Sequence, residues 1–303
     1  YAAVVAKEFN SVTIENHLKM NAIRPCDTCW NYTLADSVVN WCLRNKKRVH
    51  GHTLLWHESF PKWLKKYNSK QDSAFVENVL KEHVMKTVKR YKGKIASWDV
   101  ANEVIADKST ELRQSFWLTI LGPNFLSRII QYAKEADPDV KIFYNDYGQE
   151  YDYVKIEGID KLLATLKFQN IKIDGIGFQM HTCIQSPSLD SIKNAIMHFA
   201  KQGYLIHISE LDVPNYPKDG NKTMTDSMLR LQSERYKNIA AIYALVPQKQ
   251  RFGITTWNLS DKDSWIRTYM KDELQKPLLF DEQYKRKPAY YGFREGLKIS
   301  LKK

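Results

Sequence analysis

Three features of the sequence predict a (β/α)₈ barrel. Short apolar segments alternate with amphipathic helical segments along the chain, which is typical of parallel βαβ units. Seven such strands are recognisable, a number that favours a closed barrel. No Gly-x-Gly-x-x-Gly turn follows the first strand, as a doubly wound dinucleotide-binding sheet would require.

The predicted strands are short apolar runs that end in polar or aromatic residues. They cover Asn10–Ile14, Arg48–Trp56, Ile95–Asn102, Val140–Asn145, Ile173–Gln179, Tyr204–Leu211 and Arg251–Trp257. Tyr1–Phe9 is typical of the end of a helix that leads into the first of these strands. We therefore expect the first strand of the barrel to be missing, with a gap or a substitute element between Asn10–Ile14 and Arg251–Trp257. The alternative is that Ala2–Val5 forms this strand.

Helical segments with an apolar period of 3.6 residues lie between the strands. The clearest is Asp72–Tyr91, where the apolar residues fall on one stripe. The others are Leu34–Asn45, Asn124–Ala136, Ile156–Gln169, Ser188–Gln202 and Asp226–Leu245. Asp137-Pro138 and Gly203 follow two of these segments, where helix terminators are expected. No linker or low-complexity tract interrupts the pattern, so we expect one domain over residues 1–303.

The composition is that of a globular protein with a basic surface. The chain has 303 residues, of which 43% are hydrophobic and 26% charged, and its net charge is +12. The sequence contains no run of about 18 apolar residues, which is the length that a membrane-spanning helix needs. A basic balance raises the possibility of nucleic acid or an acidic polymer as partner. Because the lysines are spread along helices, we expect a solvated basic surface and no nucleic-acid partner. We also expect the protein to be a monomer.

Four cysteines do not make a disulfide framework in a chain of this length. Cys26 and Cys29 have the spacing of half a zinc or redox site, but no second ligand pair completes a zinc site. We expect a local disulfide or free thiols there, and neither a metal nor a cofactor. Sequons at Asn31, Asn221 and Asn258 leave glycosylation open.

Functional side chains of such a barrel lie at the carboxyl ends of its strands. The strand ends here carry Glu15 and Asn16, Trp56 and His57, Asn102 and Glu103, Asn145 and Asp146, Gln179 and His181, Glu210 and Asp212, and Trp257. Asn102-Glu103 alone could be an ordinary turn. A second strand with the same build, ending at Glu210, instead favours a pair of carboxyl groups that work together.

Paired carboxyl groups suit cleavage of a glycosidic bond. One protonates the leaving oxygen, while the other attacks the sugar or activates water. Trp56, Trp257 and Trp265 are expected to be exposed, and aromatic faces stack on the apolar faces of sugar rings. No nucleophile elbow, phosphate loop or metal-ligand spacing points to another chemistry. The strand ends therefore predict a glycosidase.

Seven segments of the sequence resemble glycoside hydrolase family 10 xylanases. They are Phe9–Lys19, Gly51–His57, Trp98–Glu103, Asn145–Tyr147, Gly177–His181, Ile208–Asp212 and Trp257–Trp265, in the order and approximate spacing of the family. The resemblance runs from Phe9 to Tyr291. It implies a retaining endo-β-1,4-xylanase on a (β/α)₈ TIM barrel, secreted or at the cell surface, that acts on xylan or xylo-oligosaccharides.

The resemblance also implies a role for each site residue. Glu103 would be the general acid/base and Glu210 the nucleophile, with the two carboxyl groups roughly 5–5.5 Å apart. His181 and Asp212 would keep Glu210 ionised, and His57 and Asp212 are the expected orienting residues. The implied substrate-binding residues are Glu15, Asn16, Lys19, His52, Trp56, Asn102, Tyr147, Gln179, His181, Trp257 and Trp265.

Three positions depart from the usual pattern of the family. Ser59 stands where Gln is usual, Asn258 where Gly is usual, and Ile266 where Arg is usual. They affect the cleft wall and the leaving-group side, but not the catalytic pair. Two alternatives stay open. One is another β-1,4-glycanase such as a glucanase, which the space around C5 of the sugar decides. The other is a catalytically silent carbohydrate-binding homologue, which would be expected to lose a glutamate.

Overall fold

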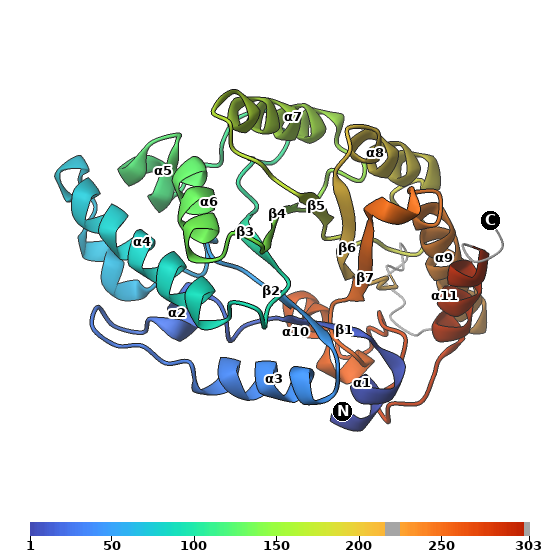
Figure 1. Ribbon diagram of the computed structural model, residues 1–303. Coiled ribbons are helices and arrows are strands. Elements are labelled where there is room, and N and C mark those ends of the chain that lie inside the picture. The colour runs from blue at the N-terminus through green and yellow to red at the C-terminus, as the bar shows by residue number, and fades with distance from the viewer. Residues whose placement is uncertain (216–224, 300–303) are drawn as a thin grey trace. The chain divides into compact units, whose positions relative to one another are not determined.

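The computed structural model describes residues 1–215 and 225–299 (Figure 1). The sequon at Asn221 lies outside the described residues. The chain forms two compact units. One consists of Phe9–Asp146 and Asp152–Gly177, and we call it the β1–β5 unit. The other, the β6–β7 unit, consists of Tyr1–Glu8, Tyr147–Tyr151 and Phe178–Lys303.

The β1–β5 unit is built on parallel strands that follow one another in chain order. Parallel pairing joins β1 to β2, β2 to β3 and β3 to β4, with Ile14 opposite Gly51 and Asn102 opposite Asn145. All six residues of β3 are buried, as expected of a strand covered on both faces. The strands are β1 (Ser11–Ile14), β2 (Arg48–Gly51), β3 (Ser97–Asn102), β4 (Lys141–Asp146) and β5 (Gly175–Phe178).

Helices lie outside these strands (Figure 1). The predicted apolar stripe is confirmed in α4, where Val76, Val79, Leu80, Val84 and Val88 are buried. Side-chain caps begin some helices: Ser115 accepts from Leu118 N in α5, and Asp152 from Val154 N and Lys155 N in α7. The elements are α2 (Met20–Ile23), α3 (Thr33–Arg44), α4 (Ser73–Arg90), α5 (Phe116–Leu121), α6 (Phe125–Ala136) and α7 (Tyr153–Phe168), with 3₁₀ turns η1 (Lys62–Lys66) and η2 (Lys70–Asp72).

The β6–β7 unit contains one parallel strand pair, β6 (Leu205–Leu211) and β7 (Arg251–Thr256), with Ile208 opposite Ile254. Its helices α9 (Asp226–Tyr243) and α11 (Pro288–Ile299) pack closely at Gly292. A Cβ atom at this position would lie only 2.2 Å from Ser233 O, so glycine allows the close approach. The remaining elements are α1 (Ala2–Glu8), α8 (Leu189–Lys201), α9 (Asp226–Tyr243), α10 (Trp265–Met270) and α11 (Pro288–Ile299), with 3₁₀ turns η3 (Gln248–Gln250) and η4 (Asp261–Asp263).

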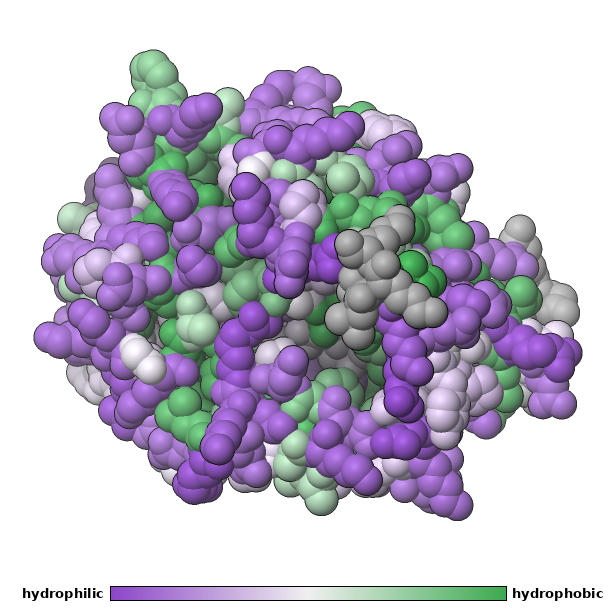
Figure 2. Space-filling model, turned by 45° about the vertical axis from the view of Figure 1, so that its right-hand side comes forward, coloured by the Kyte–Doolittle hydropathy of each residue, from purple (hydrophilic) through white to green (hydrophobic). Residues whose placement is uncertain are grey.

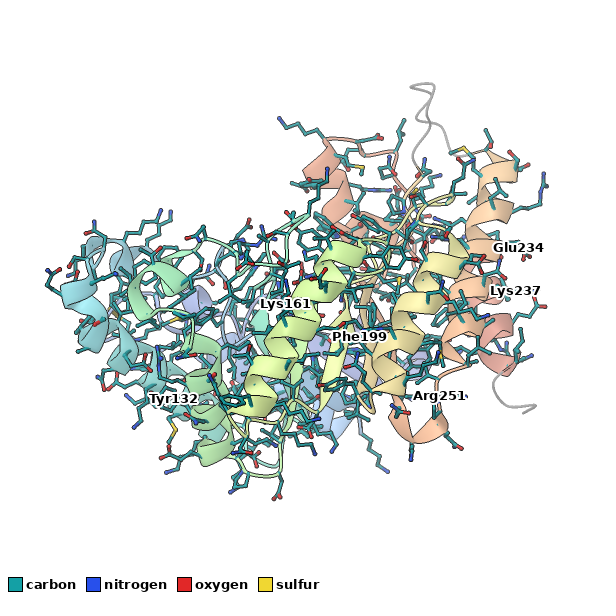
Figure 3. The ribbon with its side chains drawn as sticks, turned by 90° about the horizontal axis from the view of Figure 1, so that it is seen from above. Tyr132, Lys161, Phe199, Glu234, Lys237 and Arg251 are labelled. Atoms are coloured by element: carbon teal, nitrogen blue, oxygen red, sulfur yellow. A yellow bond between two sulfur atoms is a disulfide. The ribbon has the colours of Figure 1, made fainter. Side chains whose placement is uncertain are left out.

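Helices of both units carry ion pairs on their surfaces. Figure 3 labels Lys161 on α7, whose Nζ lies 3.1 Å from Glu157 Oε1 one turn away. It also labels Lys237 on α9, whose Nζ lies 2.9 Å from Glu295 Oε1 on α11. Pairs of this kind contribute about 0–1 kcal/mol each. The face shown in Figure 2 is mostly hydrophilic.

The N-terminal segment confirms one expectation and contradicts its alternative. Ala2–Glu8 is the helix α1, so Ala2–Val5 is not a strand. Glu8 anchors this helix by accepting hydrogen bonds from Arg286 and from the Tyr290 hydroxyl, the latter at 2.7 Å. The described part of the chain holds seven strands, as predicted. The predicted gap between β1 and β7 stays a prediction.

The predicted extent of the second strand is wrong. The sequence pattern extends it from Arg48 to Trp56, whereas β2 ends at Gly51. Beyond Gly51 the chain leaves the ladder, and Leu54 N donates to Asp99 O at 3.0 Å. Trp56 then returns to β3 through an isolated parallel bridge to Asn102. An apolar run therefore continues although the regular strand has ended.

The cysteine predictions have a definite outcome. Cys26 and Cys29 form a disulfide, while Cys42 and Cys183 are free thiols. Among residues 1–215 and 225–299, no three or more His, Cys, Asp or Glu side chains form a group that could hold a metal ion. Over the same residues, none of the helices has the length and apolar character needed to cross a membrane.

Candidate active site

Glu103 occupies a strained backbone position directly after β3. Its φ angle is +59°, in the left-handed region that non-glycine residues rarely adopt. Two hydrogen bonds hold the residue there: Glu103 N donates to Asn145 O at 2.9 Å, and Arg113 Nε donates to Glu103 O at 3.0 Å. A strained residue fixed by its surroundings in this way is typical of a functional position.

Neutral donors orient the Glu103 carboxyl group. Trp56 Nε1 donates to Oε2 at 2.9 Å, and Asn102 Nδ2 donates to Oε1 at 3.0 Å. Asn102 is itself oriented by Asn145, whose Nδ2 donates to Asn102 Oδ1 at 2.8 Å. A Cβ atom on Gly177 would lie 2.2 Å from Asn145 Oδ1, so glycine leaves the space that Asn145 needs. Each oxygen of the Glu103 carboxyl group thus accepts a hydrogen bond from an uncharged side chain.

Three predicted substrate-binding residues come together beside this carboxyl group. Lys19 Nζ donates to Asn16 Oδ1 at 2.9 Å and lies 4.8 Å from the centroid of the Trp56 ring. Trp56 in turn donates to Glu103. Glu15 precedes Asn16 at the end of β1 and is half-buried. Cation, amide and aromatic face are therefore assembled next to the carboxyl group, as a site for a polyhydroxylated ligand requires.

A buried cluster fixes the ring of His52. Its Nδ1 lies 2.9 Å from Asp99 Oδ2, and His50 Nε2 lies 2.9 Å from the same oxygen. Burial on its own would raise the pKa of Asp99, but the two histidines outweigh burial and hold this pKa well below its ordinary value. Only 2% of His52 is exposed, and Asp99 fixes the orientation of its ring. Its contact with substrate stays a prediction.

A chain of ionic contacts that sequence reasoning missed supports the backbone of Glu103. Asp146 is fully buried, and burial raises its pKa to about 6 although Lys155 Nζ lies 2.9 Å away. Lys155 Nζ also lies 3.1 Å from Asp107 Oδ1. Arg113 Nη2 donates to the same Asp107 oxygen at 3.0 Å, and its guanidinium group also bonds the carbonyl of Glu103. The chain thus runs from a buried carboxyl group to the catalytic candidate.

The His57 side chain lies near the carboxylate of the next residue, Glu58. Its Nε2 lies 3.8 Å from Glu58 Oε1. Burial, followed by the positive charge of Arg113, lowers the pKa of His57 below its ordinary value of 6.5. The ring is therefore neutral at neutral pH. Its orienting role stays a prediction.

Glu210 lies in the β6–β7 unit, where it faces a histidine. It is the last residue but one of β6 and is 5% exposed. His181 Nε2 donates to Glu210 Oε2 at 3.2 Å, and His181 Nδ1 donates to Asp212 Oδ2 at 2.9 Å. Trp265 Nε1 donates to the same Asp212 oxygen at 3.0 Å. His181 thus bridges two carboxylates.

The two carboxylates keep His181 protonated. Burial alone would lower its pKa, but Asp212 and Glu210 outweigh burial and raise the pKa well above the ordinary 6.5. The imidazolium places a positive charge next to the Glu210 carboxylate. The donors described above for Glu103, Trp56 and Asn102, are neutral.

Local contacts position His181. Met180, just before it, has φ +60°, and its N–H donates to Glu150 Oε1 at 2.8 Å. Burial raises the pKa of Glu150. Just after it, Thr182 N donates to Asp212 O at 3.2 Å, beside a parallel bridge between His181 and Asp212. The ring is thereby fixed from both sides along the chain.

The aromatic residues of this unit are less accessible than predicted. Trp257 is only 8% exposed, so the expectation that it is exposed is wrong. The backbone N–H of Trp257 donates to Leu211 O at 3.1 Å, which continues the β6–β7 pairing and turns the side chain inward. Trp265 is half-buried, and its ring centroid lies 5.1 Å from that of His181. Tyr147 is half-buried and Gln179 is 3% exposed.

The predicted site residues thus form two groups, one in each unit. The β1–β5 unit carries Glu15, Asn16, Lys19, His52, Trp56, His57, Asn102 and Glu103. The β6–β7 unit carries Tyr147, Gln179, His181, Glu210, Asp212, Trp257 and Trp265. The separation of the two carboxyl groups stays a prediction.

The His181 imidazolium makes folding stability depend on pH in a defined direction. Its folded-state pKa lies above its unfolded-state value of 6.5, so its stabilisation is complete below pH 6.5 and is lost as pH rises through the folded-state pKa. Asp212→Asn removes one of the two carboxylates and lowers that pKa. The free energy of unfolding should therefore fall less steeply in Asp212→Asn than in the unmutated protein as pH rises above about 6.5.

The measurement is denaturant unfolding at several pH values. Asp174→Asn is the matched control, because Asp174 pairs with Lys134 and Lys172 rather than with a histidine. The control should keep the slope of the unmutated protein. Equal slopes for Asp212→Asn and the unmutated protein would show that His181 is not held protonated by Asp212.

Comparisons with known proteins point in one direction. The family model "Glycosyl hydrolase family 10" matches residues 1–296. Endo-1,4-beta-xylanase B of Thermotoga neapolitana is 35% identical over 302 residues, which is 100% of this chain and 84% of that protein. The crystal structure of native xylanase 10B from Thermotoga maritima covers 100% of this chain and 90% of its own at 35% identity, with a TM-score of 0.91. Xylanase 10B from Thermotoga petrophila, in complex with xylobiose, covers 99% and 89% at 35% identity, with a TM-score of 0.90.

Proposed function

Because the chain belongs to glycosyl hydrolase family 10 and has the TIM-barrel fold of its solved relatives, we propose that it is an endo-1,4-β-xylanase. The observation that carries this proposal is the contrast between its two glutamates. Glu103 accepts hydrogen bonds from neutral Trp56 and Asn102, whereas Glu210 lies beside the His181 imidazolium. Each of the two carboxyl groups is thus oriented by its own set of neighbours, as a pair that divides acid and nucleophile roles requires.

The proposed reaction has two displacements. Glu103 donates its proton to the glycosidic oxygen while Glu210 attacks the anomeric carbon, so the bond to the leaving sugar breaks and a glycosyl–Glu210 ester forms. Glu103, now a carboxylate, then takes a proton from water. The water oxygen attacks the anomeric carbon and releases Glu210. Two inversions at one carbon give net retention.

The neighbours of Glu103 support a role in holding the sugar chain. We expect Lys19 and Asn16 to hydrogen-bond the hydroxyl groups of a sugar whose ring lies against Trp56. We also expect Asn102, which Asn145 orients, to bond the 2-hydroxyl group at the cleavage point. Xylan and xylo-oligosaccharides are the proposed substrates; one relative was solved with xylobiose. We further propose that residues 1–303 act as one catalytic domain and that the protein works as a monomer.

Reducing-sugar release from xylan, compared with β-1,4-glucan, tests this function. The unmutated protein should cleave xylan internally and leave β-1,4-glucan essentially intact, and Glu210→Ala should cleave neither. Comparable rates on both polymers would favour the glucanase alternative. Binding of xylan without any cleavage by the unmutated protein would favour the catalytically silent alternative.

Arg113 is proposed to position Glu103 through the backbone. Arg113→Lys keeps a positive charge near Asp107 but loses the fork that bonds the carbonyls of Glu103 and Ile105, at 3.0 and 3.3 Å. Because a shift of about 1 Å in a catalytic group can cost about 10²-fold in rate, kcat on xylan should fall roughly 10- to 100-fold with little change in KM.

Arg128→Lys is the matched control for that substitution. Arg128 also combines a carboxylate and a carbonyl, bonding Glu77 Oε2 at 2.8 Å and Leu121 O at 3.0 Å. Its variant should keep kcat. If both variants lost kcat equally, or if Arg113→Lys raised KM alone, Arg113 would not be positioning Glu103.

We further propose that the protein works outside the cytosol, as a secreted or cell-surface enzyme. The Cys26–Cys29 disulfide supports this, because disulfides persist in oxidising compartments. A polymeric substrate is also met outside the cell. Protein denatured without reductant should therefore show two reactive thiols, Cys42 and Cys183, and four after reduction. Four reactive thiols before reduction, in protein from its native host, would contradict the proposal.

A further inference from the structure

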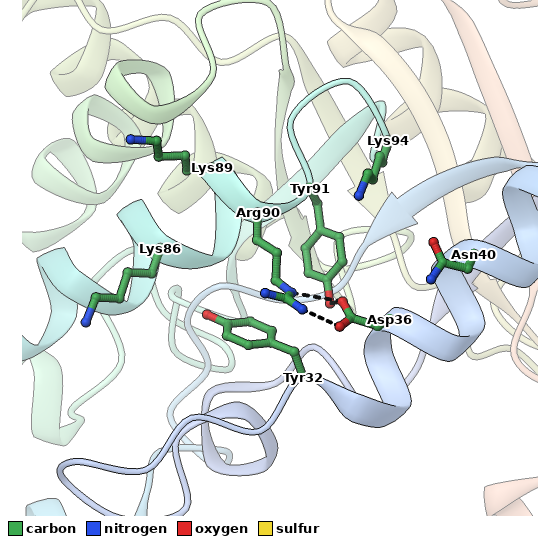
Figure 4. Close-up of a pocket in the computed structure, with 8 residues that line it drawn as sticks. All are labelled: Tyr32, Asp36, Asn40, Lys86, Lys89, Arg90, Tyr91 and Lys94. Atoms are coloured by element: carbon green, nitrogen blue, oxygen red, sulfur yellow. Dashed lines mark hydrogen bonds and ion pairs between the residues drawn. The ribbon is translucent and has the colours of Figure 1, made fainter.

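A pocket of about 660 Å³ lies on the β1–β5 unit where α3 meets the last turn of α4 (Figure 4). Its lining combines two tyrosines, an amide, one carboxylate and four cations. The proposed reaction uses none of these side chains. The proposed function therefore does not explain why four cations line this pocket.

The one carboxylate of the pocket is already satisfied. Asp36 accepts from Arg90 Nε at 2.9 Å, from a second guanidinium nitrogen, and from the Tyr91 hydroxyl at 2.9 Å. The Arg90 hydrogen bonds, opposed in part by burial, lower the pKa of Asp36. Asp36 thus stays ionised and neutralises Arg90. Four cations less one carboxylate leave a net charge of +3, carried by Lys86, Lys89 and Lys94.

Lys94 points toward that central pair, whereas the ammonium groups of Lys86 and Lys89 lie on its other side and point away from it (Figure 4). Lys89 and Lys94 are exposed. Lys86 Nζ lies 4.5 Å from the centroid of the Trp30 ring, at the end of the pocket away from Lys94. Cations in the last turn of a helix stabilise its dipole, which accounts for Lys89 and Arg90. This explanation does not cover Lys94, which lies in the turn after the helix, or Lys86, one turn earlier.

These charges select an anion, and the rest of the lining suits a sugar. Ammonium groups are compact cations that bind carboxylates as point charges. The exposed amide of Asn40 offers a donor and an acceptor for hydroxyl groups, and the Tyr32 ring adds an aromatic surface. We propose that this pocket binds the carboxylate of a uronic-acid residue on the polysaccharide substrate. The proposal deepens the proposed function and rests on it.

The pocket is separate from the catalytic position. The last turn of α4 and Lys94 precede β3, whereas Glu103 follows it. A strand of six residues spans about 20 Å, so the two lie at opposite ends of β3. A polymer held here by an acidic branch would be kept at high local concentration, because a second, weak attachment makes rebinding intramolecular.

The test measures binding of glucuronoxylan and of the same polymer after chemical reduction of its carboxyl groups. Affinity electrophoresis with Glu210→Ala as the background keeps the polymer intact. Adding Lys89→Ala and Lys94→Ala should weaken binding of glucuronoxylan about 5-fold, since two exposed charge contacts are lost, and leave the reduced polymer bound as before. Lys94→Ala alone should give a smaller loss in the same direction.

Lys141→Ala with Lys167→Ala is the matched control, because both lysines are exposed, lie in the same unit and change the net charge equally. It should not alter the preference for the acidic polymer. An equal loss in the control pair would assign the effect to the overall charge and overturn the proposal. So would equal binding of the acidic and reduced polymers by the unmutated pocket. Since this assay requires no turnover, a failure of xylan hydrolysis would overturn the proposed function separately.

Discussion

Glu210→Ala is expected to lower kcat on xylan at least about 10⁴-fold, because it removes the atom that attacks the anomeric carbon. His181 and Asp212 remain in place, so the cavity left by the side chain stays beside a cationic imidazolium. A small anion should fit there. Azide should therefore restore cleavage of an aryl xylobioside and give an α-configured glycosyl azide, after a single inversion.

Two outcomes would contradict the role of Glu210. Cleavage of xylan by Glu210→Ala at near the original rate would exclude it as nucleophile. Rescue by azide with a β-configured product would place the anion in the second displacement, and Glu210 would then be the acid/base. Asp272→Asn is a useful control, because Asp272 is a buried carboxyl group of the same unit that accepts hydrogen bonds from Leu274 N and Gln275 Nε2.

Glu103→Ala is expected to separate substrates by their leaving groups. Without a proton donor, kcat on xylan should fall about 10²–10⁴-fold. A dinitrophenyl xylobioside needs no protonation to leave, so its first displacement should proceed at nearly the original rate. Because Glu103 also activates the water, the glycosyl-enzyme should then accumulate. Stopped-flow measurements should show a burst of phenol followed by slow turnover.

The result that would contradict this role is equal loss on xylan and on the activated substrate, with no burst. The basic limb of the kcat/KM profile on xylan should also disappear in Glu103→Ala, since that limb reports loss of the acid's proton. Asn102→Ala provides a comparison. It leaves Glu103 in place but removes a side-chain donor to it, so it should retain the burst-free kinetics of the unmutated protein at a lower rate.

The fold was predictable because its signals are periodic and repeated. Each predicted strand exists, and the stripe on α4 is buried as the pattern requires. Short elements escaped because they span too few residues for a period. For α5 and α10 the available signal was a capping serine, Ser115 or Ser264. The helix α11 was also missed although it is 12 residues long, and the signal available for it was Pro288 at the first helical position, where proline is favoured.

The site was predictable in its residues but not in its contacts. Glu103 and Glu210 stand out because carboxyl groups interrupt apolar strands. Lys155 and Arg113 carry no such mark: a lysine in the first turn of a helix and an arginine in a loop are ordinary surface residues. Their role comes from contacts that no local pattern encodes, such as the 3.1 Å ion pair between Lys155 and Asp107, 48 residues apart. Trp257 was misjudged for the same reason, because a strand end does not show which way its last side chain turns.

The most direct test of the retaining mechanism is to trap the covalent intermediate. A 2-deoxy-2-fluoro-xylobioside with a dinitrophenyl leaving group slows both displacements, and the good leaving group favours the first. The intact mass should rise by one fluoroxylobiosyl group, and peptide mapping should place it on Glu210. An adduct on another residue, or turnover without any adduct and with an α-configured first product, would contradict the assignment of Glu210 and Glu103 as nucleophile and acid/base.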